Sequence, residues 1–136
     1  CYYGPHMQRK GACGGDDVWN PNYMEKLITA LGGRPIEYSS KTMSVGNPSL
    51  LTLGPSVMKM TAKVLNDAKK AGASIIVSAC SLSHSNLDSY QGKAGRVAKK
   101  DTSIPAVNLT EIIAFALGHH VDRFAQLKTR ALIIGS

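Results

Sequence analysis

Apolar positions recur at helical spacing in several segments of this chain and form short continuous runs in others. The spacing predicts helices over residues 20–33 and 54–72, each with a proline near its start and a glycine at its end. A third helix is predicted from Thr110, as the N-cap, to Gly118, and Ser81 can begin another. In segment 54–72, lysines occupy the face opposite the apolar stripe, which indicates a helix that buries one side and exposes the other.

Short apolar runs suited to β-strands lie between these helices. They are residues 1–4, 35–38, 74–79 and 104–107. The run 74–79 is continuous and rich in β-branched residues, which is typical of a strand buried on both faces. The alternation of strand and helix predicts an α/β fold of three layers, Rossmann-like, with a largely parallel sheet and helices on both faces. One domain covers residues 1–136.

Composition and charge exclude several classes of protein. A chain of 136 residues, 43% of them hydrophobic, can bury a core without metal or disulfides. No apolar run approaches the roughly 18 residues of a membrane span, and no secretory leader is expected. The net charge of +7 is spread in short pairs among few aromatic side chains, which favours a solvated basic face over nucleic-acid binding. Three irregularly spaced cysteines indicate a reducing, cytoplasmic compartment.

Cys80 is the residue whose position by itself indicates chemistry. It follows the most apolar strand and precedes a helix start, so its sulfur is expected at the carboxyl edge of the sheet, where α/β folds bind ligands. A helix N-terminus also favours a thiolate, but a small buried apolar role fits the position equally well. The glycine-rich segment 11–17 matches no nucleotide-binding motif and is interpreted as a loop. His119 and His120 are interpreted as a helix-end pair rather than a metal chelate.

Three motifs occur in order along the chain and carry a resemblance to a known family. They are Tyr2-Tyr3-Gly4-Pro5-His6, Lys41-Thr42-Met43-Ser44-Val45-Gly46, and Ser78-Ala79-Cys80-Ser81-Leu82-Ser83 with Asn86-Leu87-Asp88 after it. They resemble Y-Y-G-C-H, K-T-x-C-C-G and T-A-C-P-L-C of the cysteine-rich CCG domain found in the B subunit of heterodisulfide reductase. Unorthodox succinate dehydrogenase and anaerobic glycerol-3-phosphate dehydrogenase subunits share that domain. The resemblance extends from Tyr2 to about Gly118 and implies an oxidoreductase family.

The ligand positions are where this chain departs from the family. The family binds an iron–sulfur cluster or zinc through five cysteine positions, which are occupied here by Pro5, Ser44, Val45, Cys80 and Ser83. Only Cys80 carries a thiol, and the other side chains are poor ligands or none, so no cofactor is expected in this chain. Cys1 and Cys13 lie off the pattern and receive no role. A natural paralogue that persists as a scaffold and an engineered form with replaced ligands both fit this loss.

The resemblance implies an electron-transfer or disulfide-reductase module that lacks most cluster ligands and is inactive on its own. Cys80 remains for thiol chemistry, with His6 and His84 as nearby proton donors. Because the family's domain usually occurs twice in one chain, residues 1–136 are expected to be the C-terminal half of a longer subunit. The implied partners are flavoprotein or iron–sulfur subunits of a redox complex, cytoplasmic or peripheral to the membrane through them. The alternative is a non-catalytic docking domain that binds an acidic partner subunit.

Overall fold

Two short parallel strands form the centre of the fold. The computed structural model describes residues 1–9, 11 and 16–119. Within them β1 (Ile76–Ser78) pairs in parallel with β2 (Ala106–Asn108), and Val77 lies opposite Val107. The strands predicted at 74–79 and 104–107 are therefore present, but the ladder is shorter than the apolar runs. All of β1 is buried, as its continuous apolar sequence predicts.

The N-terminal segment extends this sheet by backbone contacts. Tyr2 forms an isolated parallel bridge with Ser78, and its N–H donates to the carbonyl oxygen of Val77 at 2.8 Å. On the other side of the segment, the N–H of Tyr3 donates to the carbonyl oxygen of Lys41 at 2.9 Å. The N-terminal segment therefore lies between β1 and the backbone at Lys41, beside the two-stranded sheet of β1 and β2.

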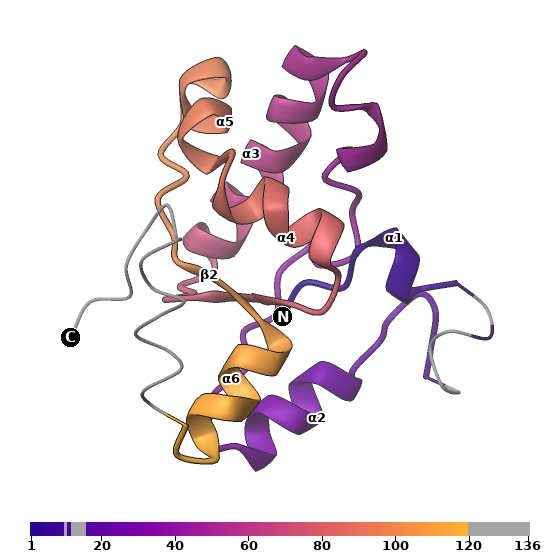
Figure 1. The fold of residues 1–136 in the computed structure, drawn as a ribbon, viewed down its shortest axis with the longest axis vertical. Helices are drawn as coiled ribbons and strands as arrows, with labels where there is room; N and C mark the ends of the chain where they lie inside the picture. Colours follow the sequence, from indigo (N-terminus) through magenta and orange to yellow (C-terminus); the bar gives the residue numbers. More distant parts are fainter. Residues whose placement is uncertain (10, 12–15, 120–136) are drawn as a thin grey trace.

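Helices cover both faces of the sheet (Figure 1). They are α1 (Gly4–Met7), α2 (Tyr23–Ala30), α3 (Gly54–Lys70), α4 (Ser81–Asp88), α5 (Gln91–Ala98) and α6 (Leu109–Ala116), with a short 3₁₀ turn η1 (Asn47–Ser49). Ile76 and Ala106 pack in one cluster with Val64 of α3. The neighbouring strand residues, Val77 and Val107, pack on the opposite face with α2 and α6. This alternation follows from the period of two along a strand, and it confirms the three-layer α/β fold.

Several predicted elements differ from the observed ones. Residues 35–38 form no ladder within the described chain, because Pro35 lacks an N–H and the backbone contact to the N-terminal segment falls at Lys41 instead. The run 1–4 contributes one bridge before α1 begins at Gly4. Helix α5 was not predicted, because glycines in Q-G-K-A-G-R-V-A lower its helix propensity.

The starts of two helices also differ from prediction. Helix α2, predicted from residue 20, has Asn22 as its N-cap. The Asp16 carboxylate accepts hydrogen bonds from the N–H groups of Asn22 and Tyr23. These backbone hydrogen bonds lower the pKa of Asp16, and the bond from Asn22 has the largest effect. Asn108 rather than Thr110 caps α6, through a capping box with Glu111. No helix among the described residues has the length and apolar character that crossing a membrane requires.

Candidate functional site

The three motif segments meet beyond the carboxyl end of β1. A pocket of about 240 Å³ lies between them, and it is lined by Pro5, His6, Arg9, Ser44, Val45, Asn47, Pro48, Leu82 and Ser83. We call it the motif pocket. Four of the five ligand positions named from the sequence therefore line one pocket, although they come from α1, the loop after Lys41 and α4. The fifth, Cys80, is the N-cap of α4.

Cys80 and His6 form a thiol–imidazole pair at the edge of this pocket. The Sγ of Cys80 lies 3.8 Å from the Nδ1 of His6, and Cys80 is 8% exposed. A thiol beside an imidazole is the arrangement that a base-activated sulfur nucleophile requires. His84, predicted as a second proton donor, has its Nδ1 3.2 Å from the hydroxyl of Ser78.

The approach of the N-terminal segment to α4 depends on Gly4. This residue has a φ of 69°, and a Cβ added to it would lie 3.0 Å from the Oγ of Ser83. A larger residue would be strained in its backbone and pushed against α4. The missing side chain thus allows Pro5 and His6, which follow Gly4 in α1, to lie beside Ser83.

Hydrogen bonds from buried side chains hold the loop that carries Ser44 and Val45. The carbonyl oxygen of Val45 accepts hydrogen bonds from Asn86 Nδ2 at 3.0 Å and from Thr61 Oγ1 at 3.3 Å. Asn86 also accepts from Asn47 Nδ2 at 3.0 Å and is fully buried. Because these bonds come from α3 and α4, they tie the loop to both helices.

Packing and backbone geometry fix the same loop. Val45 is 1% exposed and belongs to the core cluster with β1 and α3. Gly46 then turns the chain with a φ of 73°, and a Cβ there would lie 3.1 Å from Val57 Cγ2. The N–H of Gly46 donates to the Ser44 hydroxyl at 3.0 Å. One of the five positions that resemble ligand sites is therefore part of the hydrophobic core.

Tyr2 connects the core to this site. Its hydroxyl donates to the carbonyl oxygen of Met43 at 2.8 Å, and the side chain is fully buried. Burial raises the pKa of Tyr2 to about 12, while hydrogen bonding with the Ser83 hydroxyl and the Val45 backbone opposes that rise. Tyr2 therefore stays a neutral donor at physiological pH, tying the N-terminal segment to the loop of the second motif.

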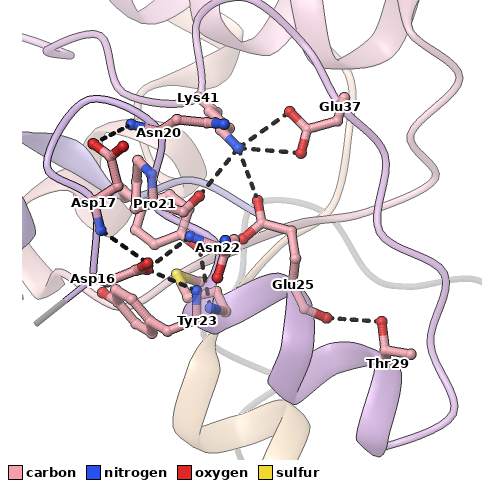
Figure 2. A network of polar contacts seen from close by, with 12 residues as sticks. Asp16, Asp17, Asn20, Pro21, Asn22, Tyr23, Glu25, Thr29, Glu37 and Lys41 are labelled. Atoms are coloured by element: carbon pink, nitrogen blue, oxygen red, sulfur yellow. Dashed lines mark hydrogen bonds and ion pairs between the residues drawn. The ribbon is translucent and has the colours of Figure 1, made fainter. Parts of the chain in front are cut away.

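A buried lysine secures the start of that loop (Figure 2). The Nζ of Lys41 lies 3.2 Å from the carbonyl oxygen of Pro21, 3.5 Å from Glu25 Oε1 and 3.1 Å from Glu37. The Lys41 side chain is 8% exposed and that of Glu25 12%, whereas Glu37 is 71% exposed. The hydroxyl of Tyr3 also donates a hydrogen bond to Glu25. Burial is the main cause that raises the pKa of Tyr3.

The described residues do not suit an iron–sulfur cluster or zinc. No group of three or more His, Cys, Asp or Glu side chains in the part of the chain that the structure describes is placed to hold a metal ion. The five ligand-like positions, Cys80 included, offer one thiol, while iron–sulfur clusters and structural zinc need several thiolate or imidazole ligands. Cys1 lies with Gly72–Val77, toward the other end of β1, and so does not complete the set. Cys13 and His120 lie outside the described residues.

Several residues that shape this site were not predicted from the sequence. Lys41 was noted within its motif, but its burial against Glu25 was not foreseen, and neither were the roles of Thr61 and Asn86. Arg9 was treated as part of a scattered basic pair, yet it lines the motif pocket. Lys41 and Asn86 lie inside the motifs, and they were the available signals of a buried polar network. Polar side chains at buried positions need specific partners.

The fold and the site together define an α/β domain with a thiol–imidazole pair beside a pocket built from three sequence motifs. No model of a known protein family matches the chain. The chain is 30% identical, over 118 residues, to the 8-methylmenaquinol:fumarate reductase membrane anchor subunit of Wolinella succinogenes. This match covers 86% of the chain and 42% of that protein.

Two further relatives are the B subunit of a heterodisulfide reductase and a protein like it. The chain is 28% identical over 109 residues to the B subunit of the ferredoxin:CoB-CoM heterodisulfide reductase of Methanosarcina mazei, covering 79% of the chain and 36% of that protein. It is 28% identical over 112 residues to a protein of Archaeoglobus profundus that is itself like the B subunit of heterodisulfide reductase, covering 81% and 38%. The chain thus spans about two fifths of the length of these relatives. These similarities are consistent with the CCG-type domain that the motifs indicate.

Proposed function

We propose that this chain is a cluster-free domain of a redox-complex subunit related to the B subunit of heterodisulfide reductase. It is one of two such domains in a longer chain, and its partners are flavoprotein or iron–sulfur subunits. Three sequence motifs support this proposal by their similarity to the relatives' domain. The observation that carries it is the convergence of Pro5, Ser44, Val45 and Ser83 on one pocket, with Cys80 at its edge.

The domain keeps its shape without the metal through two replacements. Val45 packs in the core, and the loop around it is held by Asn86 and Thr61. The hydrophobic contacts and hydrogen bonds of the loop thus take over the structural role of a metal cage, because either can fix a loop against its neighbours.

The thiol of Cys80 is the reactive group that remains at the five ligand positions. With a low-molecular-weight disulfide, the Cys80 sulfur attacks one sulfur of the disulfide, and the second sulfur leaves as a thiolate. His6 accepts the proton of Cys80 and delivers it to the leaving thiolate. The product is a mixed disulfide at Cys80, so the oxidation of Cys80 matches the reduction of the disulfide.

Restoring the ligand positions tests the proposal. We expect the chain as it stands to take up no stoichiometric cluster when reconstituted with iron and sulfide. The fourfold variant Pro5→Cys, Ser44→Cys, Val45→Cys and Ser83→Cys is expected to develop the visible absorbance of an iron–sulfur cluster. The matched control adds Cys80→Ser to the fourfold variant and should bind less iron. Circular dichroism shows whether each variant is folded.

Two outcomes would count against the assignment. A stoichiometric cluster in the unmodified chain contradicts the loss of the cofactor. A folded fourfold variant that binds no iron contradicts the interpretation of the motif pocket as a former thiolate site.

A further inference from the structure

The segment that contains helices α3 and α5 carries a large share of the positive charge of the chain. Residues 54–101 contain eight Lys and Arg but three Asp, whereas the rest of the chain has eight Lys and Arg against six Asp and Glu. The two helices lie side by side (Figure 1) and share a cluster that contains Met58, Ala62 and Ala94. Their adjacent outer surfaces therefore carry an excess of Lys and Arg.

A groove of about 390 Å³ lies on these surfaces, between the two helices. Its lining comprises Lys59, Lys63 and Asp67 of α3, Val97 and Ala98 of α5, and Lys99 and Lys100 after α5. We call this the α3–α5 groove. Four of its seven lining residues are lysines, so it presents positive charge to any group that enters it.

The one carboxylate of the groove lining, that of Asp67, already contacts neighbouring side chains. Asp67 Oδ2 lies 2.7 Å from the Nζ of Lys63 and also accepts a hydrogen bond from Ser40. Desolvation raises the pKa of Asp67, but the contacts with Lys63 and Ser40 outweigh it and lower that pKa overall. Asp67 is therefore charged and neutralised locally by Lys63.

The remaining lysines of the groove are free to bind a partner. Lys59, Lys99 and Lys100 are exposed, and none of them forms an ion pair with a carboxylate in the described part of the chain. Three exposed, like charges around one recess repel one another, and a carboxylate-bearing group would relieve that repulsion. Charge complementarity thus indicates an anionic occupant.

We propose that the α3–α5 groove binds an acidic segment of a partner protein. The recess between two helices admits side-chain carboxylates, and Val97 and Ala98 add a small apolar contact within it. A membrane-surface site would need anchors such as Trp, Phe or Leu beside the lysines, and the groove lining contains none of these. That the partner belongs to a redox complex rests on the proposed function, whereas recognition of acidic segments does not.

A fluorescein-labelled oligoglutamate peptide serves as the probe, with binding followed by fluorescence anisotropy on the full chain. The double variant Lys59→Glu/Lys100→Glu should weaken binding roughly tenfold, because two attractive contacts become repulsive. The control Lys26→Glu/Arg34→Glu makes the same change in net charge at exposed positions outside the groove, and it should bind nearly as the parent does. Added salt should weaken binding to the parent chain.

Three outcomes overturn the proposal: an unchanged affinity in the groove variant, equal losses in both variants, or tighter binding to phosphatidylglycerol vesicles than to the peptide. If the groove variant fails to fold by circular dichroism, Lys59→Gln/Lys100→Gln replaces it, with a smaller expected loss. Iron uptake by the fourfold cysteine variant carrying the groove substitutions separates the two proposals. Uptake should persist, because the groove residues do not line the motif pocket.

Discussion

Replacing Lys41 by methionine removes a buried cation from the network that holds the second motif. Methionine keeps much of the aliphatic stem, so the main loss is the ammonium group with its contacts to Glu25, Glu37 and the Pro21 carbonyl. The Glu25 side chain, only 12% exposed, then loses its ion pair with Lys41. The perturbation is therefore an unpaired, mostly buried carboxylate.

The structure allows the cost to be divided between the two glutamates. Breaking a buried ion pair by removing one partner costs about 3–5 kcal/mol, and the hydroxyl of Tyr3 still solvates Glu25, so we expect about 3 kcal/mol. The Glu37 side chain is 71% exposed, so its pair with Lys41 contributes about 0.5 kcal/mol. Glu37→Gln should thus change the free energy of unfolding very little, whereas Lys41→Met should lower it strongly.

Urea unfolding followed by circular dichroism at pH 7 measures both variants. The midpoint should fall strongly for Lys41→Met with an unchanged slope, and little for Glu37→Gln. Adding Glu25→Gln to Lys41→Met should restore about 1–2 kcal/mol, because the unpaired charge is gone. A loss below about 1 kcal/mol for Lys41→Met, or no recovery in the double variant, would refute the assignment of a buried ion pair.

Three further predictions concern the core and the site. Asn86→Ala should cost about 2–3 kcal/mol in urea unfolding, since the fully buried amide bonds both Val45 and Asn47, and a cost near zero would contradict its role in holding the loop. Tyr2→Phe should lower the free energy of unfolding at pH 7. The difference from the parent should shrink as pH rises from 10 to about 12, because the raised pKa of Tyr2 favours the folded state only while the phenol is neutral. A difference that stays constant with pH would contradict this. With Cys1 and Cys13 replaced by serine, His6→Ala should slow the reaction of Cys80 with a chromogenic disulfide roughly tenfold, whereas His84→Ala should leave the rate nearly unchanged, and equal rates in all forms would remove His6 from the mechanism.

Local pattern was sufficient where an element buries one face along its whole length. The stripe in residues 54–72 predicted α3, and Thr61, Val64, Leu65 and Ala68 of that stripe are indeed buried. It failed where tertiary contacts override propensity. Helix α5 forms despite its glycines because it packs along α3, and the apolar run at 35–38 lies outside the sheet although Tyr38 still packs against the core.

The amino-acid sequence by itself determined the α/β class, the buried strand β1 and the three motifs whose positions resemble a thiolate site. It does so because periodicity and motif spacing are properties of neighbours along the chain. Only the tertiary structure decided that Pro5, Ser44, Val45 and Ser83 line one pocket, that Cys80 meets His6 and that Lys41 is buried against Glu25. Those contacts join residues far apart in sequence, and their positions follow from how the helices and strands pack rather than from any local preference.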